Sequence, residues 1–288
     1  MRSGIWSAEA LSGAELMAKQ RLAVLGNPVA HSRSPEIHQD FARQTGIELR
    51  YEKILVPEGK FREVAKEFLA LDGIGFNITL PCKGDAYAFV EHKSSSASRS
   101  RAVNTVVVDA SGHIYGDNTD GPGLVRDLTH NLEWKIEGQR VLVLGAGGAV
   151  RGVLWDLLQA SPRYIHLHNR TGSRARALTE QLEDARITSV SAADLEDGYD
   201  LVINGTSAGL SGLVPEAPKK ILSKHSRCYN LTYGSGITAF NNWCRNTSGC
   251  EVADGMGMLV EQAALSFQLW FSRQVDTREL ISTLRNTG

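Results

Sequence analysis

Residues 141–152 read VLVLGAGGAVRG, and this stretch decides the fold of the chain. Four consecutive apolar residues, two of them β-branched, predict a short buried strand. The glycines then force a tight turn, and apolar residues recur at helical spacing from 150 to 158. Strand, glycine turn and helix open a dinucleotide-binding unit, in which bare backbone and the N–H groups of a helix N-terminus bind a pyrophosphate. The predicted cofactor-binding residues of this turn are Gly145, Ala146, Gly147, Gly148 and Ala149.

The glycine pattern is a weak signal by itself. A dinucleotide-binding turn has Gly or Ala at the sixth position, where this chain has Val150. The glycines could also serve only to make a tight turn between a strand and a helix, which is the alternative interpretation. The flanking strand and helix favour the dinucleotide interpretation because they supply the context that the motif requires.

The next turn distinguishes NADP from NAD. Residues 164–168 predict the following strand, and a polar turn comes directly after it. An NAD-binding unit places an Asp or Glu at about this point to bind the ribose 2′-OH. Here guanidinium groups replace the carboxylate and can hold a 2′-phosphate by forked, charge-assisted hydrogen bonds; the alternative is a solvated basic helix start. We predict NADP, held at this turn by Asn169, Arg170, Thr171 and Arg174.

The composition excludes several classes of function. The 288 residues suffice for two domains, and the net charge of −1 gives no field that would attract nucleic acid or an anionic membrane. No apolar run approaches the roughly 20 residues that span a bilayer, and the first 20 residues do not resemble a signal peptide. The four cysteines lack C-x-x-C spacing, which argues against zinc and against a disulfide scaffold. We therefore expect a cytoplasmic protein without a metal, whose partner is a small molecule; the oligomeric state, monomer or homodimer, is left open by the sequence.

Alternating strands and helices predict an α/β fold in two units. In the first unit helices separate the strands, which indicates a parallel sheet, and Ser34 before Pro35 is expected to cap the first helix. The second unit begins near Asp120, and a turn at 205–209 closes one of its strands at the edge where ligands bind, so Thr206 and Ser207 are predicted cofactor contacts. The apolar helix expected at 259–272 should pack back on the first unit. The remaining expected strands are 21–26, 51–56, 73–80, 102–108, 113–116, 200–204 and 227–231.

Polar clusters follow successive strands and would suit a polyhydroxylated, anionic small molecule. They contain hydroxyls, amides, a lysine and a carboxylate, which together can bind hydroxyl and carboxylate groups in a cleft. Taken singly, each cluster could also be turn or capping chemistry. The clusters lie at 32–34, 77–83, 104–105 and 118–121.

From residue 20 onward the chain resembles the shikimate dehydrogenase family over nearly its whole length. The motifs that carry the resemblance lie at 26–35, 77–83, 102–105, 118–121, 145–149, 169–171 and 254–264. The resemblance implies two α/β domains around a cleft: a substrate domain, 1–119 with 255–288, and a Rossmann-type NADP domain with a doubly wound parallel sheet, 120–254. It also implies reversible, NADPH-dependent reduction of 3-dehydroshikimate to shikimate in aromatic amino-acid biosynthesis.

The resemblance also assigns roles to single residues. Lys83 and Asp120 match the catalytic pair of the family, in which the lysine exchanges a proton with the reacting hydroxyl and the aspartate orients it. Both would also contact the substrate. The other implied substrate contacts are Ser32, Ser34, Asn77, Thr79, Asn104, Tyr233 and Gln262. The further implied cofactor contacts are Leu231, Gly255 and Met258.

Some positions depart from the family pattern. Cys82 stands where an aromatic residue is usual, Arg101 replaces a glycine, and Gly205 replaces a common alanine; the stretch 93–101 is unusually basic and rich in serine. These departures leave open a paralogue that acts on quinate or an amino analogue. A catalytically silent protein that senses NADP or shikimate is the alternative from another class, although such a sensor would not need Lys83 and Asp120.

Overall fold

The computed structural model describes residues 19–206, 208, 213–234 and 236–286, and it divides into two compact units. The first unit runs to Thr119 and includes Gln262–Leu280. The second unit comprises Asp120–Glu261 and Ile281–Gly288. Residues 255–261 and 281–286, which the sequence analysis placed with the first unit, group with the second in the structure.

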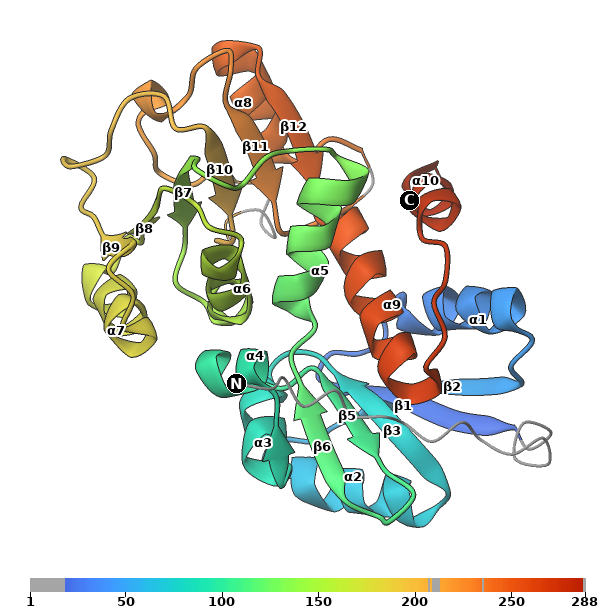
Figure 1. Cartoon of the computed structure of the whole chain (residues 1–288). Helices are drawn as coiled ribbons and strands as arrows, with labels where there is room; N and C mark the ends of the chain where they lie inside the picture. Colours follow the sequence, from blue (N-terminus) through green and yellow to red (C-terminus); the bar gives the residue numbers. More distant parts are fainter. Residues whose placement is uncertain (1–18, 207, 209–212, 235, 287–288) are drawn as a thin grey trace. The chain divides into compact units, whose positions relative to one another are not determined.

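The first unit is built on a six-stranded sheet with the order β2-β1-β3-β5-β6-β4 (Figure 1). Its strands are β1 (Gln20–Gly26), β2 (Leu49–Leu55), β3 (Gly73–Ile78), β4 (His92–Lys93), β5 (Thr105–Val108) and β6 (Ile114–Asp117). Its helices are α1 (Ser34–Thr45), α2 (Phe61–Ala70), α3 (Lys83–Phe89) and α4 (Ser95–Ser100), together with most of α9 (Met256–Phe271).

This first sheet is mixed, so the expectation of a parallel sheet was wrong here. Strand β1 pairs in parallel with β2 and β3, but β5 runs antiparallel to both β3 and β6. The antiparallel pairing of β5 with β6 follows from the short turn at Ser111-Gly112, where Gly112 has a φ of 84°. A turn this short can join only antiparallel neighbours, because a parallel pair needs a crossover of a dozen or more residues.

Side chains of successive strand residues point to opposite faces of the first sheet, and each face has its own helices. Phe76 and Ile78 of β3 pack with residues of α2 and α3. The opposite face packs against α1 and α9, where Leu22 contacts Trp270. Asn77 lies between Phe76 and Ile78, so its side chain points to the α1 and α9 face.

The second unit has a six-stranded parallel sheet with the order β12-β11-β10-β7-β8-β9. Read from β9, this is the 3-2-1-4-5-6 order of a doubly wound dinucleotide-binding fold, so the Rossmann prediction is confirmed. The strands are β7 (Arg140–Leu144), β8 (Tyr164–His168), β9 (Ile187–Ser189), β10 (Leu201–Asn204), β11 (Arg227–Asn230) and β12 (Glu251–Asp254). The helices are α5 (Asp120–Arg126), α6 (Gly148–Gln159), α7 (Gly172–Leu182) and α8 (Ala239–Ser248), with most of α10 (Arg278–Asn286).

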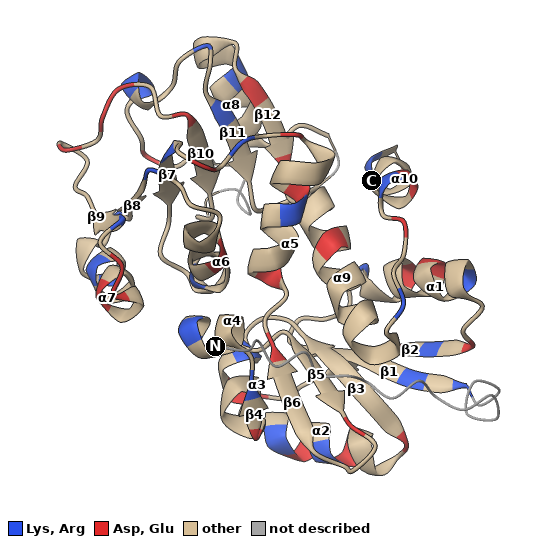
Figure 2. Ribbon diagram, viewed as in Figure 1, with Lys and Arg blue, Asp and Glu red and all other residues tan. Residues whose placement is uncertain are grey.

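The alternation along β7 places helices on both faces of the second sheet. Val141 and Val143 pack with residues of α5, α6 and α7, whereas Leu142 and Leu144 pack with residues of α8. Charged residues of both signs occur along α7 (Figure 2). Within the part of the chain that the structure describes, no helix is long and apolar enough to cross a membrane.

Candidate active site

Asn77 is the centre of a buried polar network in the first unit. Its Oδ1 accepts hydrogen bonds from the hydroxyl of Tyr51 (2.7 Å) and from Nε2 of His38 (3.1 Å). Its side chain is 5 % exposed, so water contributes little to its hydrogen bonding. The Nδ2 atom of Asn77 lies 3.1 Å from each of three oxygen atoms: Asn104 O, Thr105 Oγ1 and Ser266 Oγ.

His38 fixes the direction of that amide. The imidazole ring is fully buried and stacks on Tyr51 with ring centroids 4.6 Å apart. Burial lowers the pKa of His38 from 6.5 to about 3, against the opposing effect of its hydrogen bond to Asn77. The ring is therefore neutral at physiological pH. Because Oδ1 of Asn77 can only accept, Nε2 carries the proton, which fixes the tautomer.

Asn104 connects this network to the α9 helix. Its Oδ1 accepts a hydrogen bond from the main-chain N–H of Thr119 (2.9 Å). Its Nδ2 donates to the hydroxyl of Thr119 (3.0 Å) and to Oε1 of Gln262 (3.3 Å). The structure therefore brings together three of the predicted substrate residues, Asn77, Asn104 and Gln262.

The network also contains residues that the sequence analysis missed. Thr105 and Thr119 lay inside the polar clusters but were given no role. His38 and Tyr51 were not singled out, although both face Asn77 from neighbouring elements. Ser266 was detectable in principle, because it interrupts the apolar face of the helix predicted at 259–272.

The serine pair lies at the start of α1. The hydroxyl of Ser32 donates to Oγ of Ser34 (3.1 Å), and the main-chain N–H of Ser34 donates to Oγ of Ser32 (3.3 Å). Ser34 is the first residue of α1 and not its cap, because Arg33 has the N-cap position without a side-chain hydrogen bond. The predicted capping role of Ser34 was therefore wrong. Its hydroxyl is instead engaged with Ser32.

Thr79 follows β3 and packs against the end of β1. Its main-chain N–H donates to the carbonyl of Leu25 (2.9 Å). Its methyl group fills the space beside Gly26, where an added Cβ would lie 2.3 Å from Cγ2 of Thr79. This close contact explains why a glycine stands at position 26.

Lys83 and Asp120 each begin a helix. Lys83 is the first residue of α3 and is half-buried; its carbonyl accepts a hydrogen bond from the N–H of Val103 (3.0 Å). Asp120 is the first residue of α5 and is 7 % exposed. The helix N-terminus stabilises a carboxylate at that position. Lys83 belongs to the first unit, whereas Asp120 and the predicted substrate residue Tyr233 belong to the second.

The turn after β7 requires glycine at position 145. Gly145 has a φ of 107°, and an added Cβ would lie 2.9 Å from the carbonyl oxygen of Gly205. Gly147 is the N-cap of α6, and open space surrounds the position where its Cβ would be. With Gly148 and Ala149 exposed at the start of α6, the N–H groups of this helix end are accessible to an anion.

Two departures from the expected pattern contact each other. Val150 occupies the sixth position of the turn motif and is fully buried. A Cβ added to Gly205 would lie 2.4 Å from Cγ2 of Val150. The larger side chain at position 150 thus occupies the space that an alanine at position 205 would need, which accounts for both departures together.

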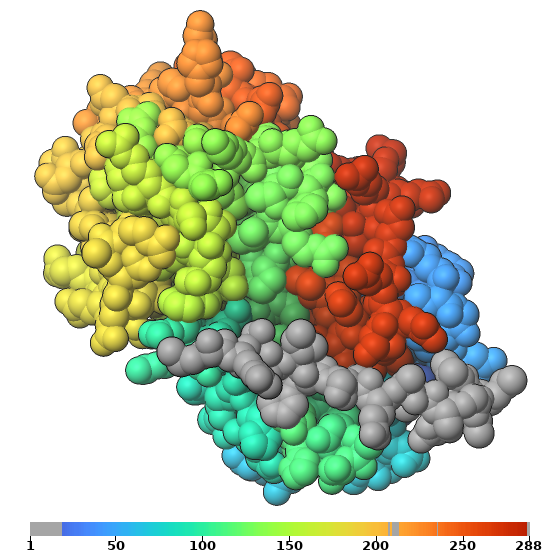
Figure 3. All heavy atoms as spheres, in the orientation of Figure 1, coloured from blue at the N-terminus to red at the C-terminus, as the bar shows by residue number. Residues whose placement is uncertain are grey.

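A cavity of about 400 Å³ lies beside the glycine turn, between α6 and α7, two helices on the face of the second unit seen in Figure 3. Two guanidinium groups line it, from Arg174 and Arg151, and none of the described lining residues is acidic. Arg170 is exposed and does not line the cavity. The sequence analysis missed Arg151, although it lies in the decisive stretch, in the first turns of α6. The other lining residues are Ala146, Gly147, Gly148, Ala177, Leu178 and Gln181.

The turn after β8 presents its side chains to solvent. Nδ2 of Asn169 donates to the carbonyl of Thr171 (2.9 Å), and Thr171 is the N-cap of α7. Beyond β10, the hydroxyl of Thr206 donates to Oδ1 of Asn204 (2.8 Å). Ser207, the other predicted contact there, lies outside the described residues.

The first residues of α9 contact the end of β11. An added Cβ at Gly255 would lie 2.3 Å from the carbonyl oxygen of Leu231, so the two main chains touch. The main-chain N–H of Met258 donates to the hydroxyl of Tyr229 (3.3 Å). The structure therefore places the predicted contacts Leu231, Gly255 and Met258 around one turn.

Comparison with known proteins identifies the family. The chain matches the shikimate dehydrogenase substrate binding domain at residues 24–106, the shikimate/quinate 5-dehydrogenase model at 127–228 and the shikimate 5-dehydrogenase C-terminal domain at 255–285. It is 47 % identical over 266 residues to the shikimate dehydrogenase (NADP(+)) of Alkalilimnicola ehrlichii, covering 92 % of this chain and 98 % of that protein. The chain belongs to the shikimate dehydrogenase family.

Solved structures agree with this assignment. Shikimate 5-dehydrogenase from Thermus thermophilus, determined in complex with NADP(H) and shikimate, superposes with a TM-score of 0.84 at 33 % identity, covering 93 % of this chain and all of that one. An enzyme of Pseudomonas putida gives a TM-score of 0.88 at 38 % identity, covering 92 % of this chain and 98 % of that one. The family resemblance expected from the motifs is thereby confirmed.

Proposed function

We propose that this chain is an NADP-dependent oxidoreductase that interconverts shikimate and 3-dehydroshikimate. The observation that carries this proposal is the identity of 47 % to a shikimate dehydrogenase (NADP(+)) over almost the whole length of both chains. The first unit supports it, because its hydroxyl and amide groups suit a polyhydroxylated substrate. The reaction is a step towards the aromatic amino acids.

NADP is the cofactor, and the residues of the second unit fit it. Gly145 makes the tight turn, Gly147 provides the bare backbone that a pyrophosphate needs, and the end of α6 offers N–H groups. We assign the phosphate groups to the glycine turn and to the guanidinium groups of Arg151, Arg174 and Arg170. When bound, NADP would supply the hydride acceptor for shikimate and, as NADPH, the hydride donor for the reverse reaction.

We assign the proton transfer to Lys83 and Asp120. A carbinol carbon gives up hydride only as its hydroxyl loses a proton, and the reverse reaction needs that proton returned. The amine of Lys83 would take the proton from the reacting hydroxyl and give it back. The carboxylate of Asp120 would orient the same hydroxyl and the lysine.

Seven polar side chains would hold the remaining groups of the substrate. Asn77 has its amide engaged inside the first unit, so its contribution includes holding the main-chain carbonyl of Asn104 in place. Gln262 shares that network through Asn104. The full set of proposed contacts is Ser32, Ser34, Asn77, Thr79, Asn104, Tyr233 and Gln262.

The decisive experiment mixes the pure protein with shikimate or quinate and with NADP⁺ or NAD⁺, and follows the nicotinamide absorbance in all four combinations. We expect the fastest turnover with shikimate and NADP⁺. A higher rate with quinate and NAD⁺ would identify the quinate paralogue, and a flat trace from folded protein in all four would identify a silent sensor. The comparisons favour neither alternative.

A further inference from the structure

The carboxyl group of Asp127 is buried in the second unit and takes no part in the reaction proposed above. Asp127 follows α5 and begins a five-residue π-helix, Asp127–Asn131. It is fully buried, and burial raises the pKa of its carboxyl group. Its Oδ2 accepts from the hydroxyl of Tyr229 (2.7 Å), and its Oδ1 accepts from Nδ2 of Asn131 (3.0 Å).

The hydroxyl of Tyr229 connects Asp127 to the first turn of α9. Tyr229 lies on β11 and is fully buried. Its hydroxyl donates to Asp127 and accepts from the main-chain N–H of Met258 (3.3 Å). Both hydrogen-bonding functions of the hydroxyl are therefore used, one on each side.

The start of α9 also packs directly against the carboxyl group. A Cβ added to Gly257 would lie 1.9 Å from Oδ1 of Asp127, so this close approach requires glycine. A negative charge at that point is favourable because the N-terminus of a helix carries a partial positive charge. The sixteen residues of α9 make this a full-length helix and not a short turn.

A second set of contacts holds the next turn of α9. Nδ2 of Asn131 donates to Oε1 of Glu261 (2.9 Å) as well as to Asp127. The other oxygen of Glu261, whose side chain is 2 % exposed, pairs with Nε of Arg126 (3.1 Å). The first two turns of α9 are thus attached to the segment 126–131.

This part of the second unit would hold the nicotinamide half of the cofactor. In a doubly wound fold each half of the sheet binds one nucleotide. The glycine turn follows β7 and opens the half formed by β7, β8 and β9, so the half formed by β10, β11 and β12 takes the other nucleotide. Leu231, Gly255 and Met258, which adjoin Tyr229, belong to that second half.

We propose that Asp127 and Tyr229 are positioning residues for the nicotinamide half of NADP, because they hold the first turn of α9 and with it Gly255 and Met258. Neither side chain needs to touch the cofactor. This inference rests on the proposed function, which assigns Gly255 and Met258 to cofactor binding. The residues that hold the first turn of α9 are thus distinct from the groups of the glycine turn that are proposed to bind phosphate.

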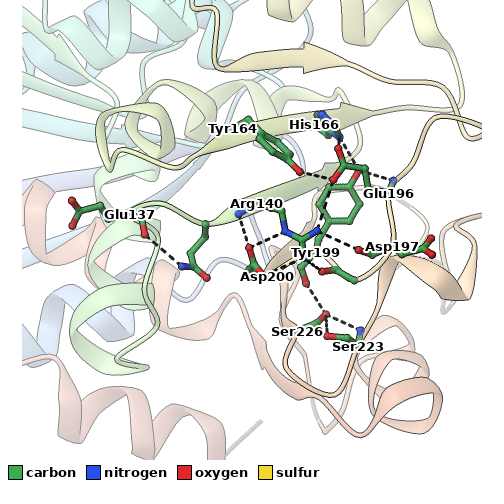
Figure 4. Close-up of polar contacts among 12 residues, drawn as sticks. Glu137, Arg140, Tyr164, His166, Glu196, Asp197, Tyr199, Asp200, Ser223 and Ser226 are labelled. Atoms are coloured by element: carbon green, nitrogen blue, oxygen red, sulfur yellow. Dashed lines mark hydrogen bonds and ion pairs between the residues drawn. The ribbon is translucent and has the colours of Figure 1, made fainter.

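A matched control exists in the same unit. Tyr199 is also fully buried and precedes β10; its hydroxyl lies 2.8 Å from Nδ1 of His166 and accepts from the N–H of Glu196 (3.1 Å). Figure 4 shows this hydroxyl within a polar cluster that includes Arg140. Tyr199→Phe and Tyr229→Phe remove the same atom from equally buried sites, so both cost stability, but only Tyr229 is attached to α9.

The test measures NADP⁺ binding by calorimetry and amide hydrogen exchange of the peptide 255–262 without ligand. For Tyr229→Phe we expect about a three- to tenfold rise in the Kd of NADP⁺, the usual effect of one lost hydrogen bond, and faster exchange of that peptide. Asp127→Asn keeps an acceptor for Tyr229 and should raise Kd by about two- to threefold. Tyr199→Phe should leave both Kd and the exchange within twofold of wild type.

Equal effects of Tyr229→Phe and Tyr199→Phe on Kd and on exchange would overturn the inference. If Tyr229→Phe does not fold, Asp127→Asn decides the same comparison. Turnover separates this inference from the proposed function: the KM for NADP⁺ should rise in Tyr229→Phe while the KM for shikimate stays within twofold. Binding and exchange need no substrate, so a wild-type protein that binds NADP⁺ but does not oxidise shikimate would refute only the proposed function.

Discussion

The buried network around Asn77 and the cavity beside Gly145 represent two ways of building a binding site. In the first unit the proposed site consists of side chains that hydrogen-bond mainly to one another and most of which are buried. In the second unit it consists of main chain, glycines and exposed arginines around a cavity. The first arrangement links binding to stability, because the same hydrogen bonds serve both. In the second arrangement, substitutions of exposed residues can change the affinity for the cofactor with little loss of stability.

The largest effect is expected from replacing Lys83. This residue belongs neither to the buried network around Asn77 nor to the lining of the cavity, and its replacement should slow the chemical step. Lys83→Ala removes the proposed proton-transfer group, so turnover should fall by roughly 10²–10⁴-fold, the usual contribution of a positioned acid–base. Substrate binding should change much less. Steady-state kinetics with shikimate and NADP⁺ would measure both quantities, and near-normal turnover would remove Lys83 from the mechanism.

Replacement of Asn77 tests whether binding and stability are linked in the first unit. Asn77→Ala removes the acceptor of the Nε2–H of the fully buried His38 and of the hydroxyl of the half-buried Tyr51, at about 1–3 kcal/mol each. The free energy of unfolding should fall by about 2–5 kcal/mol, and the KM for shikimate should rise. Asn246→Ala, an exposed position in α8, is the control and should change stability by less than about 0.5 kcal/mol in urea unfolding. Similar losses in the two variants would contradict the linkage.

Acid should weaken the first network through His38. The pKa of His38 is about 3 in the folded protein, against 6.5 for an unperturbed histidine. Between these values the unfolded chain binds a proton that the folded chain does not, so the stabilisation is present above pH 6.5 and is lost as pH falls towards 3. From pH 6.5 to 4.5 the contribution of this group should fall by about 2 kcal/mol. Urea unfolding at both values should show that difference in wild type and a smaller one in His38→Gln; equal slopes would refute it.

The smallest effects are expected at the arginines of the second unit, and they should concern affinity alone. Arg174→Ala and Arg151→Ala each remove a guanidinium group from the cavity and should raise the KM for NADP about tenfold. Arg170→Ala should raise the KM for NADP less on its own because Arg170 does not line the cavity.

The double variant Arg170→Ala with Arg174→Ala should raise the KM for NADP far more than that for NAD, and an equal rise would mean that these arginines do not bind the 2′-phosphate.

The thermal stability of the arginine variants is the control measurement. Each arginine is exposed, so thermal unfolding should stay close to wild type in all three single variants. A larger effect of Arg170→Ala than of Arg151→Ala on the KM for NADP would show that the turn after β8 is more important than the cavity wall.

The elements with strong local signals could be predicted from the sequence. Residues 141–152 combine an apolar run with glycines in an order that few other structures require, and the doubly wound sheet follows from it. The antiparallel pair of β5 and β6 was missed in the first unit. The turn at Ser111-Gly112 was recognised, but not its consequence that the strands on either side of so short a turn run antiparallel. Helix α10 (Arg278–Asn286) was missed although Leu280, Ile281 and Leu284 recur at helical spacing and are all buried.

Residues of the candidate site that belong to a sequence motif could be predicted. Their hydrogen-bond partners from elements distant in the sequence could not. Asn77 and Asn104 lie in recognisable polar clusters. Their partners His38 and Ser266 lie 39 and 189 residues from Asn77, and only the fold brings them together. Arg151 lies close in sequence to the glycine turn, but it was overlooked because only residues 145–149 of that stretch were considered as cofactor contacts.

The contact between Val150 and Gly205 restricts how this family member can diverge. A change of Gly205 to alanine is blocked while valine remains at position 150, and with a small residue there the end of the Leu231 side chain, 2.9 Å from the added Cβ, would still have to shift. A small residue at position 150 must therefore be introduced before alanine at position 205, so the order of the two substitutions decides whether each intermediate can pack.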